Sequence, residues 1–185
     1  MFRVRSFIAI DICDNVLVSK ITNLQEYITK SGARLKLVEP QNLHFTLRFL
    51  GEIPVSLVEE IKTVLQNVKF NPFDIYLKGL GAFPTIKRPR VIWIGVTEGA
   101  DNLVKLSSMI NDEIKKLRLP PPDKPFTPHL TIARVKKLNP RLNAILEKNK
   151  NIDIGLMKIN KFYLKKSTLT SRGPIYETLA EYELK

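Results

Sequence analysis

The amino-acid sequence predicts an α+β fold made of two related lobes, each a sheet with helices on one face, with a cleft between them. Stretches in which apolar and polar residues alternate, as in strands, are interleaved with stretches of helical apolar spacing. The order of these stretches repeats along the 185 residues of the chain. Apolar residues make up 44% of the sequence and charged residues 26%, which is typical of a globular protein with its own core.

The first half of the chain alternates strands and helices. Its expected elements are a strand at 4–11, a helix beginning near 14, a strand at 43–50, a helix beginning near 56 and a strand at 73–78. Asp14 is a good N-cap for the first helix, and Gly32 is a good terminator because glycine adopts left-handed backbone conformations without strain. Ser56 and Glu59 have the spacing of a capping box at the start of the second helix.

The second half shows the same order of elements. They are a strand at 91–96, a helix opened by Asp101, a proline break at 120–122, a strand at 129–135, a helix beginning at Asn139 and Pro140, and strand patterns at 152–164 and 176–184. His44 aligns with His129 at a shift of 85 positions, which keeps strands and helix starts in phase. We therefore expect one domain over 1–185 with repeat units of roughly 1–85 and 86–185. The repeat leaves open whether strands are exchanged between the units.

The charge of the chain indicates an acidic partner. Lys and Arg number 30 against 18 Asp and Glu, a formal net charge of +12. Such a field attracts polyanions and favours RNA, DNA or a nucleotide as partner, although a basic composition can also serve solubility alone. Cys13 is the only cysteine, which excludes an intramolecular disulfide and a cysteine-based zinc site. No apolar stretch has membrane-spanning length and no secretory signal is recognised, so a cytoplasmic protein is expected.

Both histidines of the chain open the same local pattern. The sequence reads His-Phe-Thr-Leu at 44–47 and His-Leu-Thr-Ile at 129–132. Because side chains alternate along a strand, each His shares a face with its Thr, while the apolar residues face the core. One His or Thr on a strand is usually structural, since Thr is also favoured there for packing. Two copies in phase with an internal repeat favour a functional pair of sites.

This pair of strands suits acid–base chemistry at a phosphate. An unperturbed histidine has a pKa of about 6.5, so one copy can act as an acid and the other as a base near neutral pH. A hydroxyl two residues further on can donate a hydrogen bond to an anionic oxygen. Two such strands facing each other would hold a phosphate, protonate a leaving oxygen and activate water on the opposite side. The pattern does not say which histidine is the acid.

A metal ion or a cofactor is not expected. No cysteine lies near His44 or His129, and no carboxylate stands at a zinc-ligand spacing from either. Asp123 is the only carboxylate close in sequence to His129. The sequence also lacks the glycine-rich loops that cradle the phosphates of nucleotide cofactors.

Four further residues are candidates for substrate binding. Arg48 follows on the histidine face of its strand and is placed to touch phosphate. Arg134 alternates onto the face opposite His129, so it reaches the same ligand only through a bulge or a strand end. Arg90 and Trp93 form a pair that would bind a phosphate and stack a base, the alternative being a solvated loop leading to a core Trp. Three residues near the end of the chain are expected to face solvent and to add to the basic field: Lys165, Lys166 and Arg172.

Residues 44–51 and 128–134 resemble the paired His-x-Thr-x signatures of the two-histidine (2H) phosphoesterase superfamily. Within it, the sequence is most similar to the RNA 2′,3′-cyclic phosphodiesterases, also called 2′-5′ RNA ligases. Three other segments look familial: Phe-Ile-Ala-Ile at 7–10, Arg-Pro-Arg-Val-Ile-Trp at 88–93 and Gly-Pro-Ile-Tyr at 173–176. The resemblance covers essentially the whole chain.

The resemblance implies a bilobal fold of two pseudo-symmetric antiparallel sheets, with helices on their outer faces and a central active-site cleft. It implies hydrolysis of an RNA 2′,3′-cyclic phosphate end to a 2′-phosphomonoester without a metal or cofactor. His44 would then be the proton donor and His129 the proton acceptor, with Thr46 and Thr131 holding phosphate oxygens. Arg134 also matches the family pattern. We expect a monomer with no obligatory protein partner and no membrane contact.

Two other functions remain open from the sequence. The reverse reaction would join RNA ends through a 2′-5′ bond, and the same two histidines would serve it. A non-catalytic RNA-binding module would use the basic surface and Trp93 instead.

Overall fold

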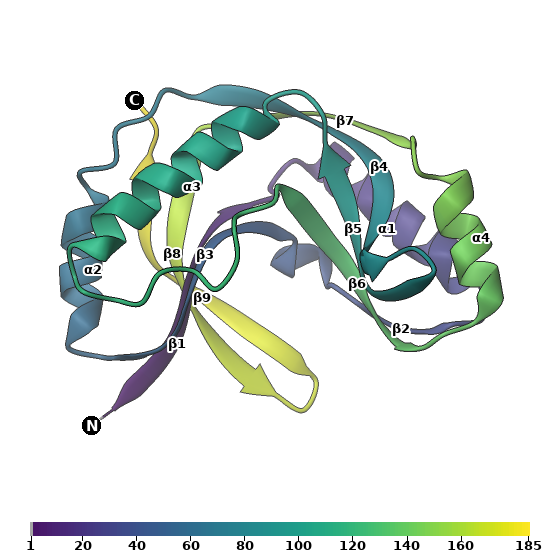
Figure 1. Cartoon of the computed structure of the whole chain (residues 1–185), viewed down its shortest axis with the longest axis horizontal. Coiled ribbons are helices and arrows are strands. Elements are labelled where there is room, and N and C mark those ends of the chain that lie inside the picture. The colour runs from purple at the N-terminus through teal and green to yellow at the C-terminus, as the bar shows by residue number, and fades with distance from the viewer. Residues whose placement is uncertain (1) are drawn as a thin grey trace.

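The computed structural model describes residues 2–185, which form nine strands, four α-helices and one short 3-10 helix (Figure 1). In chain order they are β1 (Arg3–Asp11), α1 (Asn15–Thr29), β2 (Arg34–Leu37), η1 (Pro40–Asn42), β3 (His44–Pro54), α2 (Leu57–Leu65), β4 (Phe73–Thr85), β5 (Arg88–Val96), α3 (Ala100–Lys115), β6 (His129–Lys137), α4 (Pro140–Lys148), β7 (Asp153–Ile159), β8 (Lys161–Thr170) and β9 (Gly173–Glu183). The predicted α+β class with two antiparallel sheets is confirmed. The sequence did not indicate β2 or η1, and its single strand pattern at 152–164 is two strands, β7 and β8.

The two sheets have corresponding strand orders. Followed from its His-x-Thr strand, the first sheet is β3-β1-β8-β9 and the second is β6-β5-β4-β7. The second sheet has one more strand, β2, on the other side of β6. Strand β4 leaves the first half of the chain to pair with β5, and β8 leaves the second half to pair with β1. Each sheet therefore contains two strands from the other half of the sequence, β8 and β9 in the first sheet and β2 and β4 in the second, and the sheets do not follow a division at residue 85.

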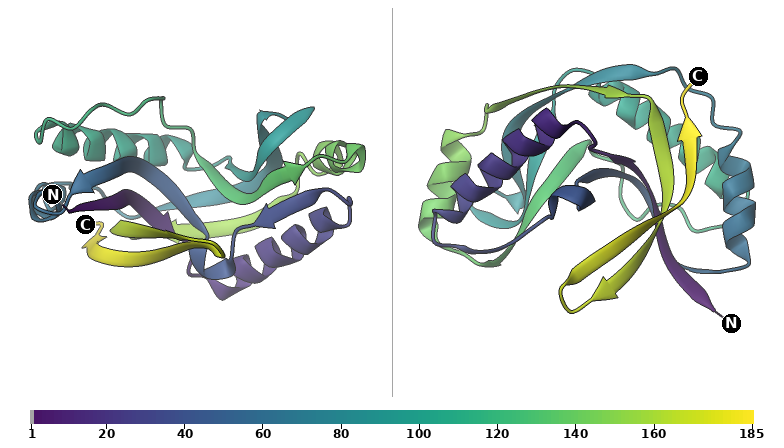
Figure 2. Two further views of the ribbon diagram at one scale, coloured as in Figure 1. Left: turned by 90° about the horizontal axis from the view of Figure 1, so that it is seen from below. Right: turned by 180° about the vertical axis from the view of Figure 1, so that it is seen from behind.

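The helices cover the faces of the sheets that turn away from the space between them (Figures 1 and 2). Helices α2 and α3 pack on β3, whereas α1 packs on β2, β6 and β7 and α4 packs on β4. Phe45 and Leu130, the residues that follow the two histidines, are completely buried. Alternation thus sends each His-x-Thr strand's apolar residues into the core and leaves its His and Thr on the opposite face. Among residues 2–185, no helix combines the length and apolar character needed to cross a membrane.

Asp14 and Asn139 are confirmed as helix caps, whereas Ser56 and Asp101 do not cap their helices. The carboxylate of Asp14 accepts hydrogen bonds from the backbone N–H groups of Val16 and Leu17, and Asn139 accepts one from Arg141. Ser56 makes no side-chain cap bond, because its own backbone is already helical rather than extended, so its hydroxyl is not placed to reach the first turn. Helix α3 begins after Gly99, whose φ of +75° is accessible to glycine, and Asp101 lies within its first turn.

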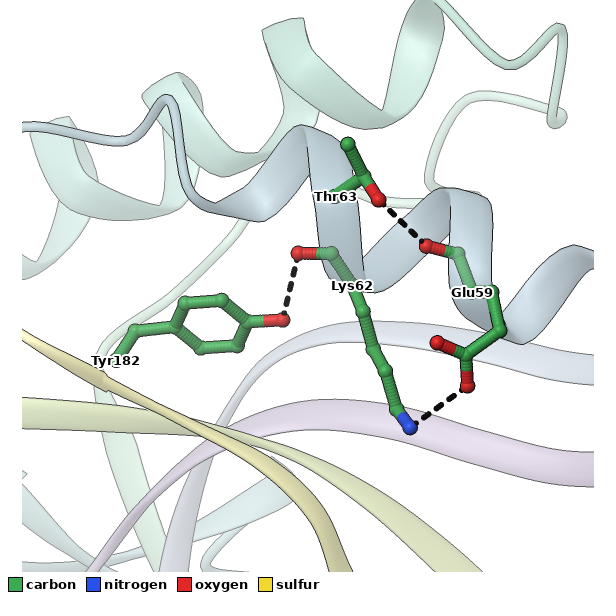
Figure 3. A network of polar contacts seen from close by, with 4 residues as sticks. All are labelled: Glu59, Lys62, Thr63 and Tyr182. Atoms are coloured by element: carbon green, nitrogen blue, oxygen red, sulfur yellow. Dashed lines mark hydrogen bonds and ion pairs between the residues drawn. The ribbon is translucent and has the colours of Figure 1, made fainter.

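The last strand is attached to helix α2 by Tyr182. Its hydroxyl donates a 3.0 Å hydrogen bond to the carbonyl of Lys62, beside a Lys62–Glu59 ion pair of 2.8 Å (Figure 3). The ring stacks on Phe162 of β8 with 4.8 Å between centroids. Burial raises the pKa of the phenol to about 12. Strands β8 and β9 are therefore held on the first sheet at the end nearest the helices, and their hairpin extends from the opposite end (Figure 1).

Candidate active site

The two His-x-Thr strands face one cavity of about 820 Å³ between the sheets. His44 and Thr46 line it from β3, and His129 and Thr131 line it from β6. The four residues singled out by the repeat come from opposite sheets and still meet in one place. The arrangement can hold an anion between two imidazoles and two hydroxyls.

A β-bulge follows each His-x-Thr pair at the equivalent position. On β3, Thr46 lies opposite Ala9 and Arg48 opposite Ile8, so Leu47 has no partner in the register. On β6, Thr131 lies opposite Trp93 and Ala133 opposite Ile92, which leaves Ile132 without a partner. An extra residue reverses the faces of everything that follows it. Three residues after each Thr, Phe49 and Arg134 therefore line the cavity.

The bulge on β3 makes the prediction for Arg48 wrong. Arg48 is only 6% exposed and does not line the cavity, because the extra residue turns it toward the helices. Its guanidinium donates to the carbonyl of Pro120 in the loop before β6. Arg134 shows the converse: strict alternation would turn it away from His129, and the bulge on β6 brings it to the cavity.

Buried side chains from helices satisfy the carbonyl groups of the two bulged residues. The hydroxyl of Ser107, on α3, donates a 3.0 Å hydrogen bond to the carbonyl of Leu47. The amide of Gln25, on α1, donates a 2.8 Å hydrogen bond to the carbonyl of Ile132. Both donors are at most 2% exposed. Each bulge is thus held by a polar side chain from the other half of the chain. For Leu47 this bond removes the cost of a buried unpaired carbonyl, and for Ile132 it adds to the 2.9 Å hydrogen bond from the backbone N–H of Val38.

Both imidazoles are oriented by the backbone two residues before them. Nδ1 of His44 lies 2.6 Å from the carbonyl oxygen of Asn42, and Nδ1 of His129 lies 2.6 Å from that of Thr127. A carbonyl can only accept, so Nδ1 carries the hydrogen in both rings and Nε2 is left for chemistry. Nε2 of His44 lies 2.9 Å from the hydroxyl oxygen of Thr46.

The surroundings of His44 favour its neutral form when no ligand is bound. Burial lowers the pKa of His44; the hydrogen bond to Asn42 and the nearby carboxylate of Asp11 raise it, and the ammonium of Lys165 lowers it. The rings of Phe7 and Tyr176 pack against the imidazole at centroid distances of 5.1 and 5.3 Å.

An ion pair lies beside His44. Nζ of Lys165 is 2.6 Å from a carboxylate oxygen of Asp11, and Asp11 lies directly across the ladder from His44. The expectation that Lys165 faces solvent is wrong, since this residue is 6% exposed. Lys166 does face solvent and pairs with Glu177. Neighbouring residues of β8 thus carry lysines to opposite faces of the sheet.

Beside His129 lies the indole of Trp93. Trp93 lies across the ladder from Thr131, where the first sheet has Ala9, and packs 6.5 Å from the His129 ring and 5.3 Å from Phe83. The structure places Trp93 against His129 and does not bring it to the cavity, contrary to its predicted role in base stacking. Arg90 is exposed and also absent from the cavity, because Val91 lies across from Arg134 and so turns Arg90 to the other face.

Several cavity residues were not singled out by sequence. Phe49 lies beyond the His-x-Thr pattern at 44–47 and is 48% exposed, and Arg172 was expected only as a surface charge. Lys36 lies on β2, whose four residues are too short for a strand signal. The tail motif at 173–176 was noticed, and its Tyr176 packs on His44. Among residues 2–185, no three His, Cys, Asp or Glu side chains gather closely enough to form a metal-binding group.

Comparison with known families and proteins gives a consistent result. The model of the LigT-like phosphoesterase family matches the chain twice in tandem, over residues 14–93 and 94–176. An RNA 2′,3′-cyclic phosphodiesterase of Archaeoglobus fulgidus is 41% identical over 179 residues, which cover 97% of this chain and 99% of the relative. A protein of the same name from Aquifex aeolicus is 46% identical over 153 residues, 80% of this chain and 81% of the relative.

Solved structures show the same fold. The protein TT0787 of Thermus thermophilus superposes with a TM-score of 0.79 at 28% identity, and 97% of each chain is covered. Escherichia coli LigT, crystallised with 3′-AMP, superposes with a TM-score of 0.80 at 22% identity over 100% of this chain and 99% of its own.

Removing the hydroxyl that holds the first bulge is expected to destabilise the protein. Ser107→Ala leaves the buried carbonyl of Leu47 without its side-chain donor, so the free energy of unfolding should fall by about 1–3 kcal/mol. Ser108→Ala, at the exposed neighbouring position of α3, is the matched control and should change it by no more than about 0.5 kcal/mol. Urea unfolding measures both, and equal effects would contradict this role of Ser107.

The two residues of the ion pair beside His44 are expected to shift the pKa of this histidine in opposite directions. Asp11→Asn removes a group that raises the pKa of His44 and should lower it further, whereas Lys165→Met removes a group that lowers it and should raise it. NMR titration of the imidazole measures the shifts, and the two histidine signals are assigned with a His129→Gln variant. Glu177→Gln, on the other face of the sheet, is the control. Shifts of the same sign in both variants would refute the electrostatic explanation.

Proposed function

This chain belongs to the LigT-like phosphoesterase family, and on that premise we propose that it hydrolyses RNA 2′,3′-cyclic phosphate ends to 2′-phosphomonoesters. One observation carries the proposal: two imidazoles and two hydroxyls from matched strands line a single cavity. Relatives named RNA 2′,3′-cyclic phosphodiesterase that align over 97% and 80% of the chain support the choice of substrate.

In the proposed reaction the two histidines act on opposite sides of the phosphorus. Nε2 of His129 takes a proton from water as the water oxygen bonds to phosphorus. The bond from phosphorus to O3′ breaks, and Nε2–H of His44 gives its proton to O3′. The 2′-phosphate remains, His44 ends neutral and His129 ends protonated, and exchange with solvent restores both. The division of roles follows the family resemblance.

The hydroxyls of Thr46 and Thr131 donate to the non-bridging oxygens of the phosphate in this proposal. Without a ligand, the hydroxyl of Thr46 contacts Nε2 of His44 instead. Binding therefore replaces a contact within the protein by one to the substrate. No metal is assigned a part, because an acid, a base and donors for the phosphate oxygens are all supplied by side chains.

Substrate binding is expected to protonate His44. Burial keeps its pKa low in the free protein, and the anionic phosphate provides a counter-charge beside the ring. His44 is then protonated in the bound state, in which it gives its proton to O3′.

Loss of either histidine is expected to remove most turnover. His44→Ala or His129→Ala should lower kcat by roughly 10²–10⁴-fold, the usual contribution of a positioned acid or base. The assay follows a short RNA with a 2′,3′-cyclic phosphate end and identifies the product as a 2′- or 3′-phosphate. Circular dichroism checks the fold, and near-normal turnover in a folded variant would refute the mechanism.

Two controls separate this proposal from its alternatives. The wild-type protein should keep full activity in excess chelator; a loss that a divalent ion restores would overturn the metal-free mechanism. An RNA with a 5′-hydroxyl is added in a second experiment. Joining that outruns hydrolysis at modest RNA concentration would make 2′-5′ ligation the main activity.

The pH dependence of the kinetics should show that the pKa of His44 differs between the free and the substrate-bound protein. His44 must be protonated to act as acid, so kcat/KM should fall as pH rises through its pKa in the free protein, which lies below the ordinary value of about 6.5. The bound anion raises this pKa, so the alkaline limb of kcat should lie at higher pH than that of kcat/KM. Steady-state kinetics over pH 5–9 measure both limbs, and coincident limbs would contradict the proposal.

A further inference from the structure

The cavity extends beyond the two histidines along a wall of cationic side chains. Among the cavity-lining residues the structure describes, five cations lie outside every ion pair: Arg5, Lys36, Arg134, Lys136 and Arg172. Glu39 is the one carboxylate among the lining residues, and it accepts a hydrogen bond from Gln41. One cyclic phosphate carries a single charge and does not account for this concentration of positive charge.

Four of these cations form a continuous row, here called the basic row: Arg134, Lys36, Lys136 and Arg172. Arg134 and Lys136 follow Thr131 on the cavity side of β6, and Lys36 of β2 lies directly across the ladder from Arg134. Nζ of Lys36 lies 3.6 Å from where a Cβ atom on Gly173 would be, next to Arg172 in the β8–β9 turn. The basic row thus leads from the second His-x-Thr strand to the hairpin of the first sheet.

The spacing of the basic row suits an extended nucleic-acid strand. Arg134 and Lys136 are alternate residues of β6, about 6.6 Å apart along the strand, and Lys36 lies across the ladder from Arg134, so the charges form a line along which a phosphate backbone can lie. Across the cavity, Phe49 is 48% exposed and the guanidinium of Arg5 lies 4.6 Å from its ring centroid. A positive groove with an exposed aromatic is the usual composition of a single-strand binding surface.

We propose that the basic row binds the phosphates on the 5′ side of the terminal nucleotide, so that the preferred substrate is an oligonucleotide rather than a cyclic mononucleotide. The inference rests on the proposed function for the location of the cyclic end. It adds the length of the substrate and the residues that hold it: a single strand of several nucleotides, held by backbone charge rather than by base sequence.

The test compares two substrates that share the same terminal nucleotide. One is a nucleoside 2′,3′-cyclic phosphate, and the other is a five-nucleotide RNA with the same cyclic end. The wild-type protein should show a higher kcat/KM for the oligonucleotide. This preference should shrink with salt, because log K falls by about 0.7 per phosphate contact for each tenfold rise in salt on a single strand.

Charge removal locates the contacts. Lys136→Ala combined with Arg172→Ala should lower the ratio of the two kcat/KM values by about tenfold or more, roughly 0.7 kcal/mol or more for each contact. The matched control is Lys148→Ala combined with Lys150→Ala, which removes the same charge from exposed positions at the end of α4, outside the cavity. It should leave the ratio unchanged.

Binding provides a second readout that does not require turnover. Fluorescence anisotropy of a labelled five-nucleotide RNA ending in a 2′-phosphate should show weaker affinity for the double variant of the basic row and normal affinity for the α4 control. An unchanged ratio with unchanged affinity would overturn the basic row. If the row variant alone weakens binding but neither substrate is hydrolysed, the row stands and the proposed function fails.

Discussion

Two buried hydrogen bonds control the shape of the candidate site. Ser107 donates to the carbonyl of Leu47, and Gln25 donates to that of Ile132, which also accepts from the backbone N–H of Val38, so each bulged residue is bonded to a side chain from a helix. Without the bulges, alternation would carry Phe49 and Arg134 out of the cavity while the His and Thr stayed in it. The bulges thus decide which third residue of each strand joins the His and the Thr at the cavity: Phe49 rather than Arg48 on β3, and Arg134 rather than Ala133 on β6.

The exchange of β4 and β8 between the two halves of the chain ties together the sheets that carry the His-x-Thr strands, β3 and β6. Neither complete sheet can form from one half of the sequence, since one of the two partners of β1 is β8, from the second half, and one of the two partners of β5 is β4, from the first. Ser107 and Gln25 also donate across this division. These strand pairings and hydrogen bonds therefore shape each His-x-Thr strand and also hold the two strands in position relative to each other.

Sequence patterns predicted what depends on local geometry. Alternation at 44–47 and 129–132, with the 85-residue phase, identified the His and Thr pairs, and the Asp14 and Asn139 caps followed from short-range bonds. The bulges could not be predicted, because they are a property of the pairing between strands, and this is why Arg48 was misplaced. Lys165 was misplaced for a similar reason: its partner Asp11 lies 154 residues away in sequence.

The packing of Trp93 against His129 has a spectroscopic consequence. It is the only tryptophan in the chain, and its ring centroid is 6.5 Å from that of the imidazole. A protonated imidazole in contact with an indole quenches its emission far more than a neutral one does. Excited at wavelengths that tyrosine does not absorb, the unlabelled protein therefore carries a fluorophore beside one histidine and not the other. Its intensity is expected to respond to the charge on His129 and not to that on His44, so the two histidines can be followed separately.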